Sequence, residues 1–280
     1  MKNVILFLIY GNFFISLCTV ALTCETYLLS NIPVDFNYLL FVFFSTLFIY
    51  NVQRVLFATK FYVSDHSERH RWILNHKKQL IILTVFSLTS ILFISFFIPS
   101  ENLILLMGTG IIASAYFLPF VNLRRIPGVK ALLVAAVWTA VTVYFPIRFS
   151  SVSAGFTSIT AGHRNFILLI TERFLFLLAL CIAFNIRDIQ FDKNSGVNTL
   201  PVIYGIEKAK LIAYCLLLLF VVTLFIRDPS IVSICMAVSG GLTAWLIAKS
   251  YPESGEMHYS FLIDGTMILQ AALTAMALRI

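Results

Sequence analysis

Apolar stretches of about 20 residues, the length that a helix needs to cross a bilayer, recur along the whole chain. The sequence of 280 residues is 60% hydrophobic and only 12% charged, whereas soluble domains carry about 25% charged residues. Nine stretches qualify as spans, near residues 3–23, 36–56, 79–98, 102–121, 130–147, 166–184, 209–226, 230–248 and 260–278. We therefore predict an all-α, polytopic membrane bundle of nine transmembrane helices, with residues 1–280 forming a single domain. The first stretch lacks an A-x-A-like cleavage site and is expected to be a retained helix.

Lysine and arginine are distributed unevenly over the two sides that nine spans create. With the N-terminus inside, most of them fall in the inner loops, and the outer side holds Arg148, Arg164, Arg227 and Arg279. This bias predicts a cytoplasmic N-terminus, cytoplasmic loops after the second, fourth and sixth spans, and an external C-terminus. Topology thus accounts for the net charge of +7, and we predict no nucleic-acid partner.

A polar, acidic run follows the sixth span and reads NIRDIQFDKNSGVNTLPVIYG over residues 185–205. Asn185, Asp188 and Asp192 are spaced i, i+3 and i+7, so a helix places all three on one face. Carboxylates at the mouth of a membrane bundle are costly unless a cation binds them. Mg²⁺ takes oxygen ligands and commonly bridges carboxylates to a substrate phosphate. Gly196 and Pro201 then predict a break in the helix.

This run resembles the second aspartate-rich motif of the UbiA family of intramembrane prenyltransferases, D-x-x-D-x-x-x-D-x-x-x-G-x-x-T-L-P. Asp188, Asp192, Gly196 and residues 199–201 fall in register, while Asn185 replaces the first aspartate. The resemblance implies a UbiA-like bundle in which Asp188 and Asp192 are catalytic and Asn185, Asp188 and Asp192 hold Mg²⁺. It also implies that the partners are an isoprenyl diphosphate, a hydrophobic acceptor and the lipid bilayer. No protein partner is implied.

The first aspartate-rich motif of the family, N-D-x-x-D-x-x-x-D, has lost its carboxylates in this chain. Asn51 is retained, but Val52, Val55 and Thr59 stand at the aspartate positions. Arg54 follows Asn51 by one helical turn, and a guanidinium grips phosphate bidentately. We therefore expect Asn51 and Arg54 to bind the diphosphate and the requirement for Mg²⁺ to be reduced. The alternative is that Arg54 is an ordinary anchor that reaches the lipid headgroups.

Further basic residues lie near both predicted loops. The segment after the fourth span resembles a family segment that places cations over the diphosphate, and the residues that we expect to bind there are Tyr116, Arg124 and Lys130, with Arg125 also available. Arg187 and Lys193 alternate with the two aspartates and are assigned the same role. The alternative is again that these cations are positive-inside anchors.

Other polar residues within the predicted spans are expected to have structural roles. Glu172 and Arg173 lie inside the sixth span, and since neighbours at i and i+1 do not face each other, each is expected to have a partner on another helix. Asp264 in the last span is expected to make a structural hydrogen bond. The loop 58–78 is amphipathic and basic, as expected of a helix in the headgroup region.

Three functions are compatible with these features. The first is a prenyltransferase-like membrane enzyme, in which electrostatic stabilisation of the leaving diphosphate is the main catalytic effect. The second is a UbiA-like protein that binds a prenyl lipid, diphosphate or quinone without catalysis, because the first motif is degenerate. The third is a transporter, against which the polar residues gather at one membrane face rather than at the midplane.

The predicted topology can be checked by labelling single cysteines in the intact membrane. Cysteines placed at Asp65 and Gln190 are expected to be protected from an impermeant thiol reagent added outside, since both loops are predicted to be cytoplasmic. Labelling of either residue from the outer side contradicts the topology.

Overall fold

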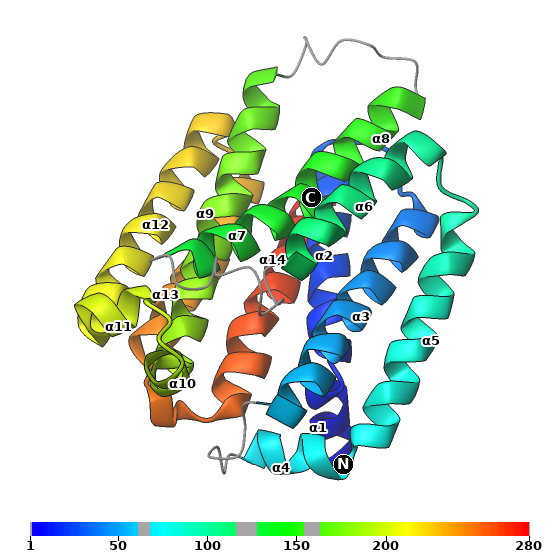
Figure 1. Cartoon of the computed structure of the whole chain (residues 1–280). Helices are drawn as coiled ribbons and strands as arrows, with labels where there is room; N and C mark the ends of the chain where they lie inside the picture. The colour runs from blue at the N-terminus through cyan, green and yellow to red at the C-terminus, as the bar shows by residue number, and fades with distance from the viewer. Residues whose placement is uncertain (1, 61–67, 116–127, 154–162, 280) are drawn as a thin grey trace. The chain divides into compact units, whose positions relative to one another are not determined.

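The computed structural model describes residues 2–60, 68–115, 128–153 and 163–279, which form helices joined by turns and contain no strand (Figure 1). Contacts divide the chain into two compact units. Unit 1 comprises Met1–Val20 and Asp35–Gly108, and unit 2 comprises Ala21–Val34 and Thr109–Ile280. The expectation that residues 1–280 form a single domain stays a prediction.

In unit 1 the long helices α3 and α5 pack against each other, and the short α4 contacts α1, α3 and α5. The elements of this unit are α1 (Lys2–Tyr10), the first part of α2 (Phe13–Leu29), α3 (Phe36–Lys60), α4 (Glu68–Asn75), α5 (Lys77–Ser95) and the first part of α6 (Ser100–Ala115). Helix α4 covers part of the predicted amphipathic loop 58–78, whose residues 61–67 lie outside the described residues.

A bend of 64° separates α1 from α2. Asn12 adopts a left-handed backbone conformation with φ of 66°, which ends α1. The Asn12 side chain donates a hydrogen bond to Asn51 Oδ1 at 2.9 Å, and Asn51 Nδ2 donates to the backbone carbonyl of Gly11 at 3.1 Å. A backbone group without a partner is costly inside a membrane. The Asn51 amide therefore stabilises the break in the first predicted span.

In unit 2 helix α9 packs against α7 and α12, α12 packs against α13, and α13 packs against α14. The elements are α7 (Val129–Thr139), a π-helical turn (Ala140–Tyr144), α8 (Phe145–Ser153), α9 (His163–Arg187), α10 (Ile189–Asn194), α11 (Leu200–Tyr204), α12 (Ile206–Arg227), α13 (Ile231–Ala248), a 3₁₀ turn (Pro252–Ser254), a second π-helical turn (His258–Ile263) and α14 (Asp264–Ala277).

The core of unit 2 combines aromatic and small residues at the helix contacts. The rings of Phe176 in α9 and Phe220 in α12 lie 5.3 Å apart between centroids, and both side chains are fully buried. Gly240 in α13 faces the Phe220 ring so closely that a Cβ there would lie 3.1 Å from a ring carbon. Since the glycine leaves room for the ring, α12 and α13 approach each other at this level.

Seven described helices are long and apolar enough to cross a membrane, or eight if the bent pair α1 and α2 counts as one span. The predicted count of nine is therefore not confirmed among the described residues. The predicted span 102–121 is the one that does not qualify, because the described part of it belongs to α6, which has 16 residues. At 1.5 Å per residue such a helix is about 24 Å long, shorter than the hydrocarbon core of about 30 Å. Residues 116–127 lie outside the description.

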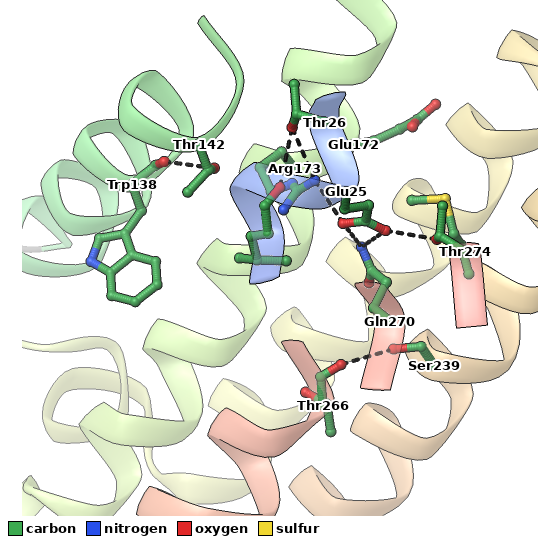
Figure 2. Close-up of polar contacts among 12 residues, drawn as sticks. Glu25, Thr26, Trp138, Thr142, Glu172, Arg173, Ser239, Thr266, Gln270 and Thr274 are labelled. Atoms are coloured by element: carbon green, nitrogen blue, oxygen red, sulfur yellow. Dashed lines mark hydrogen bonds and ion pairs between the residues drawn. The ribbon is translucent and has the colours of Figure 1, made fainter. Parts of the chain in front are cut away.

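A buried polar network ties α2, α9 and α14 together within unit 2 (Figure 2). Arg173 Nη2 lies 2.7 Å from Glu25 Oε2, and both side chains are at most 1% exposed. Gln270 Nε2 donates to both carboxylate oxygens of Glu25 at 3.2 Å, and Thr274 Oγ1 donates to Glu25 Oε1 at 2.9 Å. Thr26 Oγ1 accepts a hydrogen bond of 3.5 Å from Arg173.

A second ion pair joins α9 to α12. Arg227 Nε lies 2.8 and 2.9 Å from the two carboxylate oxygens of Glu172, whose side chain is 1% exposed. Glu172 and Arg173 thus pair with different helices, as their i, i+1 spacing predicted. Charges inside a membrane bundle are tolerated when they pair with each other.

Removing the cation of the buried pair is expected to destabilise the protein strongly. Arg173→Met leaves the Glu25 carboxylate buried and uncompensated, which typically costs about 3–5 kcal/mol. The double variant Glu25→Gln/Arg173→Met should regain part of this loss, because it removes both charges. The free energy of unfolding, measured by titration with a denaturing detergent, checks both expectations.

Arg164→Met is the matched control, since Arg164 is exposed on the same helix. An exposed substitution of this kind should change the free energy of unfolding by less than about 0.5 kcal/mol. Equal effects of Arg164→Met and Arg173→Met would contradict the structural role of the buried pair.

Candidate functional site

The predicted helix through the acidic run is interrupted at Asp188. Helix α9 ends at Arg187, Asp188 has φ of −89° and ψ of 8°, and α10 begins at Ile189. Backbone hydrogen bonds of the helical i→i−4 type nevertheless continue, from Asp188 N–H to Phe184 and from Asp192 N–H to Asp188. The two carboxylates therefore stay about one turn apart, and both approach the same lysine.

Gly196 ends α10 in a left-handed conformation with φ of 66°. The N–H of Val197 donates to the Asp192 carbonyl at 2.8 Å, and the N–H of Gly196 donates to the Lys193 carbonyl at 3.2 Å. This pair of bonds is the Schellman motif, which favours glycine at the left-handed position. Gly196 thus breaks the helix as predicted. Pro201 instead lies in the first turn of α11, where a proline starts a helix.

Lys130 brings α7 into contact with the acidic run. Its ammonium nitrogen lies 3.0 and 2.8 Å from the two carboxylate oxygens of Asp192 and 3.8 Å from Asp188 Oδ2. The Asp192 side chain is 1% exposed, whereas those of Lys130 and Asp188 are 17% and 22% exposed. Lys130 lies in the first turn of α7, where the helix dipole disfavours a cation, so the two carboxylates compensate its charge.

Arg187, the last residue of α9, forms a bidentate pair with Asp188. Arg187 Nε and Nη2 donate to the two carboxylate oxygens at 2.8 and 3.2 Å. Arg187 Nη1 also lies 3.5 Å from Glu256, and the guanidinium carbon lies 4.9 Å from the centre of the Phe184 ring. Sequence reasoning missed Glu256, whose one signal is a carboxylate just before the last predicted span.

Solved structures of UbiA homologues resemble this chain over nearly its whole length. A UbiA homologue from Archaeoglobus fulgidus, bound to GPP and Mg²⁺, superposes with a TM-score of 0.68 at 15% identity, covering 98% of this chain and 100% of that one. The apo UbiA homologue from Aeropyrum pernix K1 gives 0.61 at 15% identity over 94% of each chain. A structure described for digeranylgeranylglyceryl phosphate synthase gives 0.59 at 16% identity and covers both chains completely.

The chain has the UbiA fold. The predicted all-α, UbiA-like architecture is therefore confirmed. No model of a protein family matches the sequence, and no curated protein matches it either.

Within the UbiA fold, the predicted site residues fall into three groups. Lys130, Arg187, Asp188 and Asp192 come together in unit 2, with Asn185 buried one turn before Asp188 and Lys193 exposed at the end of α10. Asn51 and the half-buried Arg54 lie one turn apart in α3 of unit 1. Tyr116, Arg124 and Arg125 lie outside the described residues. That all of these residues form one site stays a prediction.

The position of the Lys130 ammonium beside Asp188 and Asp192 determines whether a metal ion fits the second motif. Mg²⁺ binds oxygen ligands at about 2.1 Å, so an ion between Asp188 and Asp192 would lie close to the lysine ammonium. A divalent cation about 3.5 Å from an ammonium is repelled by on the order of 10 kcal/mol at an effective dielectric constant of about 20. Among the described residues, no three His, Cys, Asp or Glu side chains gather to hold a metal. With Lys130 in this place, the residues do not fit Mg²⁺.

The turn at Gly196 can be tested by substitution with alanine. A Cβ at Gly196 meets no atom within 4 Å, so the expected cost of Gly196→Ala is the strain of a left-handed alanine, about 1–2 kcal/mol of unfolding free energy. Gly241→Ala in α13 is the control, because it also meets no atom but is helical. That control should stabilise the protein by about 0.5–1 kcal/mol. If both substitutions change the unfolding free energy in the same direction, the Schellman turn at Gly196 is contradicted.

Proposed function

We propose that this chain binds an isoprenyl diphosphate and transfers the isoprenyl group to a hydrophobic acceptor. The observation that carries the proposal is the second aspartate-rich motif, folded as a helix end with a Schellman turn, in a chain with the UbiA fold. Solved structures with this fold were determined with GPP and with DMAPP, each together with Mg²⁺. The nature of the acceptor, aromatic or lipid, is left open.

The chemistry of the transfer requires positive charge at the diphosphate. The bond between the isoprenyl carbon and the diphosphate oxygen breaks, its electron pair leaves with the diphosphate, and the carbocation is captured by the acceptor, which loses a proton. Positive groups that are fixed around the leaving oxygens stabilise this charge. In our proposal Lys130, Arg187 and Lys193 provide such groups from unit 2. Arg54 and Arg124 provide further positive charge, and the neutral side chains of Asn51 and Tyr116 provide hydrogen bonds to the diphosphate.

Arg54 is central to the proposal because two of the described cations near the acidic run, Lys130 and Arg187, are already paired with carboxylates. Lys130 is paired with Asp192, and Arg187 is paired with Asp188 and Glu256. A diphosphate therefore needs cations that come from other parts of the chain or that leave their carboxylates. Arg54 stands where the first motif has lost its aspartates, and we propose that it supplies charge that relatives recruit with a metal. The requirement for Mg²⁺ is accordingly reduced in our proposal.

The pairing of both aspartates with cations of this chain also favours a second candidate. This candidate is a UbiA-like protein that binds a prenyl lipid, a diphosphate or a quinone without catalysis. Both aspartates of the second motif have cationic partners within the chain, and the first motif carries Val52, Val55 and Thr59. A protein of this kind would bind the ligand and release it unchanged. Incubation of radiolabelled geranyl diphosphate with membranes that contain the protein and its acceptor separates the two candidates, since transfer releases inorganic diphosphate and binding alone does not.

The proposal predicts that Arg54→Ala weakens the binding of geranyl diphosphate to the purified protein. Truncating a hydrogen-bonded charge partner costs about 2–5 kcal/mol, so the dissociation constant should rise by more than about tenfold. Asp192→Asn should reduce whatever dependence on Mg²⁺ remains. Calorimetric titrations with Mg²⁺ and with EDTA measure both effects.

Lys208→Ala is the control for a general loss of positive charge, because Lys208 is exposed near the start of α12. It should bind geranyl diphosphate like the wild type. If Arg54→Ala also binds like the wild type while EDTA abolishes binding, the site works through the metal alone and the role of Arg54 is wrong. If geranyl diphosphate binds under none of these conditions, the proposed transferase function is wrong.

A further inference from the structure

We propose that the ammonium of Lys130 is the resident cation of the second aspartate motif and takes the place between Asp188 and Asp192 that a divalent metal would otherwise occupy. The inference goes beyond diphosphate binding, since it concerns the charge of the site before any ligand enters. Only its consequence, a lower demand for Mg²⁺ during diphosphate binding, rests on the proposed function.

The first support is the geometry of the contact. One ammonium nitrogen approaches both oxygens of Asp192, at 3.0 and 2.8 Å, and lies 3.8 Å from Asp188 Oδ2. A single cation thus bridges two carboxylates that are one turn apart in the chain. This arrangement is also the one in which a hard metal ion serves such a pair.

The second support is burial. The Asp192 side chain is 1% exposed, and an ionised carboxylate that is removed from water needs a compensating charge. The nearby cations have other positions: Arg187 is engaged with Asp188 and Glu256, and Lys193 is exposed on α10. Among these described cations, the Lys130 ammonium is the one that contacts both oxygens of the buried carboxylate.

The third support is the position of Lys130 at the start of α7. Gly128, with φ of 75°, starts α7 in a left-handed conformation, and Lys130 lies in the first helical turn that follows. A cation there is opposed by the helix dipole, whereas a carboxylate is favoured. The Asp192 carboxylate therefore offsets the unfavourable position of the Lys130 cation, and the cation in turn compensates the burial of the carboxylate.

The proposal is tested by the binding of Mn²⁺ in the absence of diphosphate, observed by electron paramagnetic resonance. Lys130→Met and Lys130→Gln remove the ammonium and should create a site for Mn²⁺ with at least about tenfold higher affinity than the wild type. The reason is that the repulsion of a divalent ion by an adjacent ammonium far exceeds the free energy of a tenfold change. Lys130→Arg keeps the charge and should behave like the wild type.

Two further variants separate the specific contact from a general effect of charge. Lys193→Met removes a positive charge from an exposed position next to Asp192 and should create no Mn²⁺ site. Asp192→Asn, combined with Lys130→Met, should abolish the site that Lys130→Met creates. Wild-type binding of Mn²⁺ as tight as that of Lys130→Met would overturn the proposal, as would the absence of binding to folded Lys130→Met and Lys130→Gln.

A measurement on the wild-type protein keeps the test independent of the folding of these variants. The rate at which an amine-reactive acetylating reagent modifies Lys130, followed by mass spectrometry, should be unchanged when Mg²⁺ is added. A several-fold increase with Mg²⁺ would show that the metal displaces the lysine and would overturn the proposal. Because neither measurement contains diphosphate, failure of the transferase function would leave both results standing.

Discussion

The ion pair between Glu25 and Arg173 is the interaction on which the arrangement of unit 2 depends. Two full charges with almost no exposure are stable in a membrane bundle only while they compensate each other. The pair fixes α9 against α2, and Gln270 and Thr274 extend the fixation to α14. Arg187, at the end of α9, lies roughly 21 Å along the helix from Arg173 at 1.5 Å per residue. The polar network thus sets the axial position of a helix whose far end carries the acidic motif.

In the candidate site, cationic side chains compensate the carboxylates, whereas in a metal site a metal ion does so. The carboxylates of the candidate site are paired with side chains of the same chain, through Lys130 on Asp192 and Arg187 on Asp188. Among the described residues of this site, the charges of the paired side chains largely compensate each other.

The sequence was sufficient to predict some features because their causes are local. Apolar stretches of sufficient length predict helices, the glycine at position 196 predicts the end of α10, and the i, i+1 spacing of Glu172 and Arg173 predicts partners on different helices. The identities of those partners were not predictable, since Glu25 lies far away in the chain. Hydropathy also cannot show the bend between α1 and α2, which is accompanied by a hydrogen bond between Asn12 and the distant Asn51.

The bend has a consequence for how the degenerate first motif is understood. Asn51 is the one residue of that motif that remains, and its amide closes the break at Gly11 and Asn12 from inside unit 1. These hydrogen bonds satisfy polar groups at the break whether or not a phosphate binds near them. Asn51 therefore has a structural role at the break between α1 and α2 that does not depend on a phosphate, in addition to the diphosphate-binding role that we propose for it.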